Sequence, residues 1–389
     1  MRILTTASRL DGIGGLERAQ LEACRQLRAR GHRIDLLYTE TGDLTPEWAE
    51  ITDRRVQIRG YSLYRGAPLG SLRSVAGVVS AIRRLAPDVL YAHHHRDTPA
   101  SAISGRPLVC HLHLQPPESR SWQDHLALRR SRLLIAVSRF TAERWAQSLG
   151  LPPERFAVVA NGVDLNRFAP ADARTRAEVR ASLGLPADRC LILFAGRVDP
   201  EKGVECALEA MSRLDPARFH LAVAGDANPG SFGGDRARAE AYAGDLRARY
   251  RDGAVTWLGR MQDVSPVLAA ADAVVLPSLV PDSLPLIVLE AMSSGTPVLA
   301  SAVGGIPEML TGPLEANLMP TAEPGAFARR MREICDWRTS SPELGALGRE
   351  HVERNYALDR FGARLDAAIE AAMRPATELR AERASGQRS

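Results

Sequence analysis

The sequence predicts an α/β protein in which parallel sheets are covered by helices. Two observations support this prediction. Short apolar runs rich in strand-forming residues recur along the chain, and most are followed by a stretch whose apolar residues repeat with helical spacing. The loops after these runs are polar or contain glycine. A length of 389 residues predicts two or three domains of ordinary size.

The N-terminal half opens with a strand, a helix and a second strand. The apolar run 3–6 precedes a stretch from 16 to 30 with its apolar residues on one face, and the run 34–38 follows. One α/β domain accounts for this opening and for the later strands of this half. Those strands are expected at residues 89–92, 108–112, 133–137 and 156–159.

A second α/β domain is expected in the C-terminal half. Before it, an Ala-, Arg- and Asp-rich stretch that ends at Arg189 contains Pro170 and Pro186, which is typical of a linker. A last helix is expected over residues 356–373, and the polar, charged segment after it is expected to fray. The strands of this half are expected at residues 191–195, 220–224, 255–258, 273–276 and 297–300.

These elements divide the chain into four segments. We expect an N-terminal domain over residues 1–175, a C-terminal domain over 176–355, a final helix over 356–374 and a flexible tail over 375–389. No run of about 18 apolar residues is present for a membrane span. The first residues resemble a strand more than a signal peptide, so we expect a cytoplasmic protein.

The positions of the cysteines and the distribution of charge limit the kinds of molecule that the protein is expected to bind. The five cysteines are scattered, which argues against a disulfide framework or a structural zinc site. The net charge of +4 combines +9 in residues 1–180 with −5 in residues 181–389. A basic N-terminal half favours an anionic lipid surface or a phosphorylated acceptor, although such arginines are often only solvated surface. Nucleic acid is disfavoured, because aromatic residues make up only 5% of the chain.

A single lysine stands among the 50 basic residues. Lys202 lies in a Gly-Arg-Val-Asp-Pro-Glu-Lys-Gly segment, between a predicted strand and a predicted helix. Such loops lie at the carboxyl edge of a parallel sheet, where ligands bind. A lysine ammonium is a compact charge suited to a phosphate oxygen, whereas arginine offers a planar fork. Arg197 and Lys202 are therefore a candidate diphosphate clamp, and the alternative is an ordinary surface lysine.

A glycine loop lies between the first strand and the first helix. The segment 11–18, Asp-Gly-Ile-Gly-Gly-Leu-Glu-Arg, would let the backbone approach a ligand closely. It differs from the Gly-x-Gly-x-x-Gly fingerprint of dinucleotide-binding domains. On this reasoning, Gly14 and Gly15 either let the backbone approach a ligand or form a tight turn.

Three consecutive histidines, His93, His94 and His95, follow the predicted strand 89–92. Neighbouring side chains of an extended segment point in opposite directions, so these three cannot converge on one metal ion. They stand with Arg96 and Asp97 at the ligand edge of the N-terminal domain. A place in an acceptor pocket is therefore favoured over metal binding.

Read in order, these features resemble the family 4 retaining glycosyltransferases, whose GT-B fold has two Rossmann-like domains facing each other across a cleft. The resemblance spans nearly the whole chain and implies that the final helix crosses back to the first domain. Most specific is the segment 282–292, where the family normally has two glutamates separated by seven residues; here Asp282 replaces the first and Glu290 keeps the second. The other matching motifs lie at residues 14–18, 113, 137–138, 161–164, 196–197, 202–203, 225–226, 304–305 and 307–308.

The resemblance implies a role for each matched residue in donor binding. Glu290 would hydrogen-bond the ribose of the nucleotide, and Asp282 would hold hydroxyls of the donor sugar. Backbone around residues 283–286 would meet the diphosphate, and backbone near residues 259–261 would read the base. The implied donor-binding set is Gly14, Gly15, Arg197, Lys202, Gly259, Arg260, Met261, Asp282, Ser283, Leu284, Pro285, Leu286 and Glu290.

The resemblance also implies a mechanism. Cleavage of the sugar–diphosphate bond puts negative charge on the leaving diphosphate, and fixed cations would stabilise it. Arg197 and Lys202 would do so in place of a divalent ion, so no metal and no other cofactor is expected. Retention without a covalent nucleophile suggests front-face substitution. His113 would contact the reacting sugar, unless it is a structural histidine, and the implied catalytic set is His113, Asp282, Arg197 and Lys202.

The substrates are less well defined by the sequence. We expect a hexose-type sugar, with UDP favoured over GDP as the nucleotide. The acceptor classes are a small natural product such as an aminocyclitol antibiotic core, a lipid and a glycan. A lipid acceptor would suit peripheral association with the inner face of a membrane. The candidate acceptor residues are His93, His94, His95, Arg96 and Ser138.

Three alternatives stay open. A pyridoxal-phosphate phosphorylase would use Lys202 for a Schiff base, but the chain is short for that resemblance. A nucleotide-sugar 2-epimerase shares the architecture, although the segment with Asp282 and Glu290 fits the transferases better. A catalytically silent sugar-nucleotide-binding module is favoured only by the aspartate at position 282.

Overall fold

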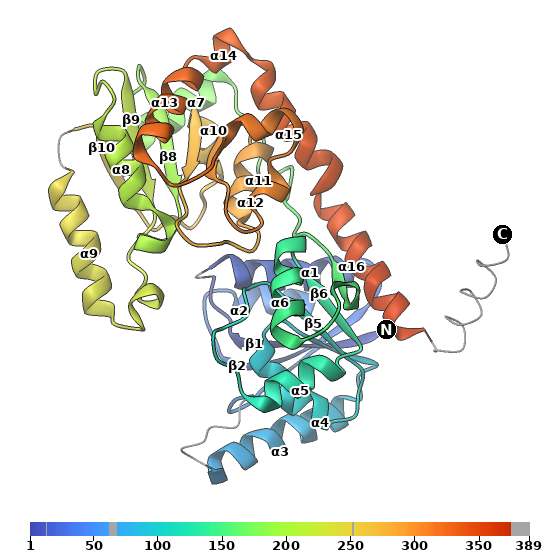
Figure 1. Cartoon of the computed structure of the whole chain (residues 1–389). Coiled ribbons are helices and arrows are strands. Elements are labelled where there is room, and N and C mark those ends of the chain that lie inside the picture. The colour runs from blue at the N-terminus through green and yellow to red at the C-terminus, as the bar shows by residue number, and fades with distance from the viewer. Residues whose placement is uncertain (13, 62–67, 251–252, 375–389) are drawn as a thin grey trace, which may run out of the picture. The chain divides into compact units, whose positions relative to one another are not determined.

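The computed structural model describes residues 1–374 apart from residue 13 and the segments 62–67 and 251–252 (Figure 1). The fold is α/β, as predicted. Each half of the chain builds one parallel sheet with helices packed around it. The predicted tail, residues 375–389, lies outside the described residues.

The chain divides into two compact units. The first contains Met1–Asn161 and the chain from Asp359 onward, and the second contains Gly162–Leu358. The chain therefore changes unit after residues 161 and 358, whereas the sequence-based domains change after residues 175 and 355.

The sheet of the first unit has parallel strands in the order β3-β2-β1-β4-β5-β6-β7. The order changes direction between β1 and β4, and in such sheets ligands bind beyond the carboxyl ends of the strands at this switch point. All of the strands predicted for this half are present, and the short edge strand β3 was not predicted. The strands are β1 (Arg2–Arg9), β2 (Arg33–Glu40), β3 (Arg54–Gln57), β4 (Val89–Ala92), β5 (Leu108–Leu112), β6 (Leu133–Ala136) and β7 (Phe156–Val158).

The helices of the first unit pack against this sheet. Helix α1 places Leu21, Cys24 and Leu27 in the interior and its charged residues outside, as expected for an amphipathic helix. The helices are α1 (Gly15–Ala29), α2 (Thr45–Ile51), α3 (Pro68–Leu85), α4 (Thr98–Ile103), α5 (Trp122–Arg130), α6 (Arg139–Leu149) and α16 (Leu358–Met373), with the 3-10 turns η1 (His95–Asp97) and η2 (Pro153–Arg155).

The sheet of the second unit has parallel strands in the order β10-β9-β8-β11-β12-β13. Its switch point lies between β8 and β11, the strands that precede Lys202 and Asp282. The predicted strands are again present, and the two-residue edge strand β13 was not predicted. The strands are β8 (Cys190–Ala195), β9 (Phe219–Ala224), β10 (Val255–Gly259), β11 (Ala273–Leu276), β12 (Val298–Ser301) and β13 (Leu318–Met319).

The helices of the second unit surround a separate apolar core, to which Phe194, Met211 and Phe327 contribute. None of the helices in the described part of the chain is long and apolar enough to cross a membrane. The helices are α7 (Ala173–Ser182), α8 (Val204–Ser212), α9 (Arg236–Arg249), α10 (Ser265–Ala270), α11 (Leu286–Ser293), α12 (Ile306–Met309), α13 (Pro324–Ile334), α14 (Trp337–Ser340) and α15 (Glu343–Asn355), with the 3-10 turns η3 (Pro200–Lys202), η4 (Pro229–Phe232) and η5 (Gly312–Asn317).

The last helix, α16, returns to the first unit, which confirms the predicted crossing. The Arg30 guanidinium donates to the backbone oxygen of Asp359 at 2.7 Å. The buried ring of His32 lies 2.7 Å from the carboxylate of Asp366. Polar contacts with the turn between α1 and β2 therefore hold α16 against this unit.

The stretch predicted as a linker contains helix α7, so that prediction was wrong. Asp172 caps the helix by accepting the backbone N–H of Thr175 at 2.7 Å. Arg180, which is buried, donates to the backbone oxygen of Ala270 and to the carboxylate of Asp272, each at 2.8 Å. The composition of this stretch did not predict the helix, because α7 is anchored mainly by the polar side chain of Arg180 and not by an apolar stripe.

Candidate functional site

The loops after β8, β11 and β12 touch each other at the carboxyl edge of the second sheet. Gly203 has a φ of +70°, and a Cβ at this position would lie 1.8 Å from the carbonyl oxygen of Pro277. Gly304 has a φ of +64°, and its Cβ would lie 2.2 Å from the carbonyl oxygen of Asp282. Only glycine allows such close backbone approach. These contacts hold the loops of Lys202 and Asp282 side by side.

Lys202 is positioned by a capped turn. The buried carboxylate of Asp199 accepts the backbone N–H of Lys202 at 3.0 Å and so closes the 3-10 turn η3. The Lys202 ammonium then donates to the carboxylate of Asp282. Both side chains remain partly exposed, 20% for Lys202 and 19% for Asp282. The predicted phosphate-binding lysine and the predicted sugar-binding acid are therefore in direct contact and reachable by a ligand.

Arg197, the second predicted clamp residue, is also paired with acids. Its guanidinium lies 3.2 Å from the carboxylate of Asp199 and 3.2 Å from that of Glu201. The Asp199 side chain is fully buried, whereas Glu201 is 42% exposed. An incoming phosphate would therefore compete with Glu201 for the guanidinium, while Asp199 keeps holding it in place.

The segment after Asp282 leads directly into α11. Ser283 and Leu284 are buried, and the helix begins at Leu286 after Pro285. Backbone N–H groups in the first turn of a helix have no partner within the helix and suit an anion. Glu290, the second acid of the predicted pair, is half-buried in this helix.

Gly259, predicted with Arg260 and Met261 to read the base, ends β10, and the other two residues follow it at the same edge of the sheet. Gly259 has a φ of +68° and accepts the backbone N–H of Gly225 at 2.8 Å. Strand β9 separates β10 from β8, the strand that leads to Arg197. The predicted segment thus lies at the ligand edge, two strands away from the predicted clamp.

The predicted residues of the first unit stand at the carboxyl ends of its own strands. Gly14 precedes α1 in an extended conformation, and Gly15 begins the helix. Ser138 is buried and caps α6, because its hydroxyl accepts the backbone N–H of Thr141 at 3.1 Å. The Ser138 hydroxyl therefore has a structural task besides any contact with an acceptor.

The three consecutive histidines do not meet at one point. The ring of His94 accepts the backbone N–H of Arg96 at 3.1 Å. The ring of His95 lies 5.8 Å, centroid to centroid, from the ring of Trp145. His93 alone turns toward His113, and the Nδ1 of His93 lies 3.2 Å from the Nε2 of His113.

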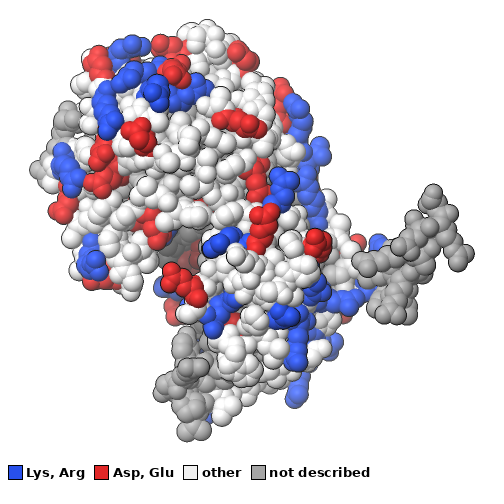
Figure 2. All heavy atoms as spheres, in the orientation of Figure 1, with Lys and Arg blue, Asp and Glu red and all other residues white. Residues whose placement is uncertain are grey.

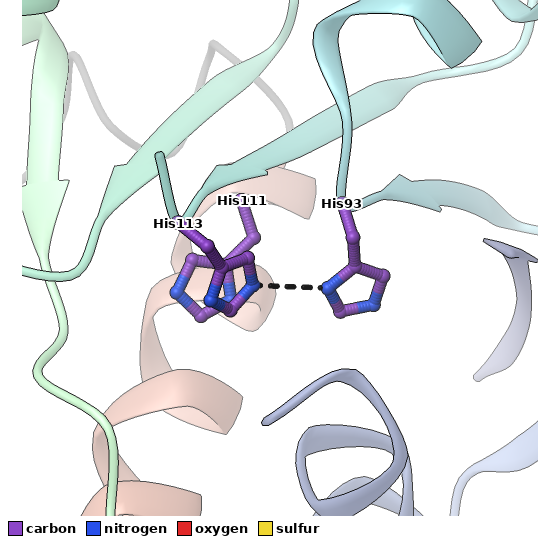
Figure 3. Close-up of side chains that lie close together, drawn as sticks. All are labelled: His93, His111 and His113. Carbon is purple, nitrogen blue, oxygen red and sulfur yellow. Dashed lines mark hydrogen bonds between the residues drawn. The ribbon is translucent and has the colours of Figure 1, made fainter. Parts of the chain in front are cut away.

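His93 forms a cluster with two other histidines, His111 and His113 (Figure 3). His93 follows β4, His111 belongs to β5, and His113 follows β5. The ring centroids of His111 and His113 are 4.0 Å apart, and those of His93 and His113 are 5.4 Å apart. The hydroxyl of Tyr91 lies 2.7 Å from the Nδ1 of His111. All of these side chains are buried.

Burial keeps the histidines of this edge neutral. Desolvation lowers the pKa of His113 to about 3 and the pKa values of His94 and His95 to about 4. The pKa values of His93 and His111 fall well below the ordinary value for the same reason, with repulsion from His113 as a second cause. At neutral pH, His113 therefore acts as a neutral donor or acceptor of hydrogen bonds.

Two residues of these edges, His111 and Asp199, were not predicted from the sequence, and the burial of Asp97 was not predicted either. His111 is two residues from His113, and alternation along a strand places such residues on one face, so this signal was available. Asp97 is buried and accepts a hydrogen bond from the hydroxyl of Thr6 at 2.8 Å. Desolvation raises the pKa of Asp97 to about 7. The sequence places Asp97 beside the histidines at the ligand edge but does not show that it is buried.

Basic and acidic side chains are mixed on the face of the molecule shown in Figure 2. Exposed ion pairs also occur in both units, for example Arg9 with Glu40 in the first and Arg236 with Glu240 in the second. The excess positive charge of the N-terminal half therefore does not gather into a patch of one sign on that face.

Two family models match consecutive parts of the chain. "Glycosyltransferase Family 4" matches residues 13–167 and "Glycosyl transferases group 1" matches residues 189–336. The first match covers most of the first unit, and the second covers the strands and loops that carry Arg197, Lys202, Asp282 and Glu290.

Relatives and solved structures agree with these models. The chain is 29% identical to D-inositol 3-phosphate glycosyltransferase 1 of Catenulispora acidiphila, over 92% of this chain and 91% of that protein. It is also 29% identical to the D-inositol 3-phosphate glycosyltransferase of Xylanimonas cellulosilytica, over 81% and 82% of the two chains. The crystal structure of HepE from Anabaena has the same fold, with a TM-score of 0.80 at 22% identity, over 95% of this chain and 100% of that chain. The chain is a GT-B glycosyltransferase and belongs to family 4.

Proposed function

We propose that this glycosyltransferase moves a hexose from a UDP-sugar to a hydroxyl of its acceptor, with retention of configuration and without a catalytic metal. The observation that carries this proposal is the ion pair of Lys202 with Asp282 at the switch point of the second sheet. The fold is shared with Anabaena HepE, whose crystal structure contains UDP and glucose. The presence of UDP in that structure supports UDP as the nucleotide.

The donor is bound by the second unit in this proposal. Lys202 and Arg197 neutralise the diphosphate, and the first turn of α11 offers it backbone N–H groups. Glu290 accepts hydrogen bonds from the ribose hydroxyls. Asp282 accepts hydrogen bonds from hydroxyls of the sugar while it holds the Lys202 ammonium in place.

The transfer step follows from these contacts. The bond from the anomeric carbon to the diphosphate oxygen breaks, and a bond from the same carbon to the acceptor oxygen forms on the same face. The leaving diphosphate oxygen takes the proton of the attacking hydroxyl, so no side-chain base is required. Arg197 and Lys202 stabilise the charge on that oxygen. Neutral His113 hydrogen-bonds a sugar hydroxyl and orients the donor.

We propose a phosphorylated cyclitol as the acceptor. The relatives that align with most of the chain are named D-inositol 3-phosphate glycosyltransferases. Such an acceptor is anionic and polyhydroxylated, which suits the basic N-terminal half. Lipid and glycan acceptors are the competing classes, and a lipid acceptor would bring a cytoplasmic enzyme to the membrane surface.

The test is an assay of the purified full chain with UDP-, GDP- and dTDP-sugars, each with inositol 3-phosphate, in the presence and absence of EDTA. We expect nucleotide release from a UDP-sugar that EDTA does not reduce. The anomeric coupling constant of the product, measured by NMR, should show the configuration of the donor. An inverted product, or loss of activity in EDTA that added Mg²⁺ restores, would contradict the proposed mechanism.

Two further outcomes identify the alternatives. Donor binding without nucleotide release, with or without acceptor, indicates a silent sugar-nucleotide-binding module. Release of UDP together with a free 2-epimeric sugar indicates an epimerase. Transfer to a lipid extract or a glycan, but not to inositol 3-phosphate, would contradict the proposed cyclitol acceptor. It would still support the proposed UDP-sugar donor.

A further inference from the structure

We propose that His93, His111 and His113 form a binding site for a divalent transition-metal ion of the zinc class. The three residues come from β4, β5 and the loop after β5, and all lie within the first unit (Figure 3). The site is therefore distinct from the predicted diphosphate clamp, which belongs to the second unit.

The first argument is the convergence of the rings. One ring nitrogen from each histidine lies within 4.8 Å of the other two. A tetrahedral zinc site with Zn–N bonds of about 2.0–2.1 Å separates its nitrogens by roughly 3.4 Å. The contact of 3.2 Å between His93 and His113 already matches this spacing. The third nitrogen lies within 4.8 Å of the other two, so a shift on the order of 1 Å would complete the set.

The second argument is the number of nitrogens without a partner. The Nε2 atoms of His93 and His111 and the Nδ1 of His113 are buried and make no hydrogen bond. A buried polar atom without a partner costs free energy, so native structures rarely leave three of them together. The nitrogens of His93 and His113 that approach each other are the Nδ1 and the Nε2, so an ion between them would take only the His111 Nε2 from this set.

Tyr91 supports the ligand role of His111. Its hydroxyl lies 2.7 Å from the Nδ1 of His111. When this Nδ1–H donates to the hydroxyl oxygen, the Nε2 carries no proton and keeps its lone pair for a metal. Histidine ligands in metal sites commonly donate their second nitrogen to such an oxygen.

The ligand chemistry selects the class of ion. The cluster contains three imidazoles and no carboxylate. Imidazole suits Zn²⁺, Co²⁺, Ni²⁺ and Cu²⁺, whereas Mg²⁺ and Ca²⁺ require oxygen ligands. Three histidines also leave a fourth position of a tetrahedron open for water or another small ligand.

The expected consequence for activity rests on the proposed function. His113 is proposed to hydrogen-bond the donor sugar, and a metal ion would occupy its ring. Zinc should therefore inhibit the transfer, although the reaction itself is proposed to need no metal. Binding and inhibition are measured separately, so failure of one is distinguishable from failure of the other.

The test of binding uses the full chain after treatment with EDTA and removal of the chelator. Calorimetric titration with Zn²⁺ should show one equivalent bound with micromolar or tighter affinity. Co²⁺ should give the visible absorption of a tetrahedral site. His93→Asn, His111→Asn and His113→Asn should each weaken zinc binding by at least about tenfold, since even outer-shell changes cost 10–100-fold. Thermal unfolding without metal checks that each variant folds.

Two control variants locate the ion. His94→Asn removes a neighbouring ring that points elsewhere, so zinc binding should be unchanged. His32→Gln dismantles the other group of the described chain that could hold a metal, His32 with Asp366 and Glu370. The proposal is overturned if zinc does not bind, if binding survives all three cluster variants, or if only His32→Gln abolishes it.

The ligand type and the activity provide the last checks. An intense near-ultraviolet band with Co²⁺ would indicate a cysteine ligand and overturn the assignment. Inhibition by Zn²⁺ that EDTA reverses would support both the metal site and the proposed place of His113. Zinc binding without inhibition would support the site and contradict the proposed contact of His113 with the donor.

Discussion

Lys202 and Asp282 are 80 residues apart in the sequence and form an ion pair at the carboxyl edge of the second sheet. Lysine occurs once in the chain, and its ammonium meets an acid that stands where family 4 enzymes normally have a glutamate. The predicted partner of the donor diphosphate, Lys202, is thus already paired with the predicted partner of the donor sugar, Asp282.

Replacement of the lysine should abolish transfer while the protein stays folded. Lys202→Ala removes a cation proposed to stabilise the leaving diphosphate, and we expect turnover to fall about 10²–10³-fold. Lys202→Arg should also lose activity, because the larger planar group does not fit the position of the ammonium. Arg236→Ala, which removes an exposed cation elsewhere, is the matched control. Near-normal turnover of Lys202→Ala would refute the clamp.

The second acid of the pair should affect nucleotide binding. Glu290→Gln keeps the shape of the side chain but removes its charge, and a hydrogen bond to a charged group contributes about 1.5–3 kcal/mol. We therefore expect the Kd for UDP, measured by calorimetry, to rise about tenfold or more. Glu350→Gln, an exposed acid paired with Arg354, should leave the Kd unchanged. An unchanged Kd for UDP in Glu290→Gln would contradict the proposed contact of Glu290 with the ribose.

The aspartate should tolerate the family residue. Asp282→Glu keeps the carboxylate and adds one methylene group, so we expect partial activity and a preserved fold. Asp282→Ala leaves Lys202 without its partner and should be inactive. Steady-state kinetics with the best donor compare the two variants. Complete inactivity of Asp282→Glu would show that the pocket is shaped for the shorter acid.

Close packing at Gly203 should make it sensitive to a single methyl group. Gly203→Ala puts a Cβ 1.8 Å from the carbonyl oxygen of Pro277 and also strains a backbone with φ of +70°. Gly184→Ala is the matched control, because its φ of +67° is similar but no atom lies within 4 Å. The control should lose ~1–2 kcal/mol of stability and Gly203→Ala clearly more, measured by urea unfolding. Equal losses would exclude the steric clash.

The buried acid Asp97 should make stability fall as pH rises. Its pKa is about 7 in the folded protein against an ordinary value of 3.8. Between these two pH values the unfolded chain releases the proton that the folded protein keeps, so unfolding is favoured progressively with increasing pH. Burial is the main cause, the Thr6 hydroxyl opposes it, and the charge of Asp124 adds to it. Tyr61 and Cys110 also face this carboxyl.

Asp97→Asn removes that proton equilibrium. The free energy of unfolding of the variant minus that of the wild type should increase between about pH 4 and pH 7 and then level off, by an amount of a few kcal/mol. Denaturant titrations at several pH values measure this difference. A difference that does not change with pH would show that Asp97 ionises normally in the folded protein.

Much of the architecture was predictable because it depends on local patterns. The apolar runs of β1, β4, β5, β8 and β11 are each bounded by loops that cannot continue a strand. The short edge strands β3 and β13 lacked such a run. Helix α7 was missed because its buried anchor, Arg180, has the composition of a surface residue.

In the candidate site, too, local features were predictable and contacts between distant residues were not. Lys202, Arg197 and Glu290 were recognisable because their spacing within short segments is distinctive. The meeting of Lys202 with Asp282, and of His93 with His111 and His113, was not recognisable, since each joins residues from different strands. The alternation of His111 and His113 along β5 was the one local sign of the histidine cluster.

The sequence by itself therefore determined most of the strands, the loops that carry charge and the family. Hydrophobic spacing and short motifs act over a few residues, so they are legible without coordinates. Only the tertiary structure decided which loops touch, which acids and histidines are buried, and which cation meets which carboxylate. Those outcomes depend on the lateral order of strands in each sheet and on close backbone contacts such as that of Gly203, which join residues far apart in the chain.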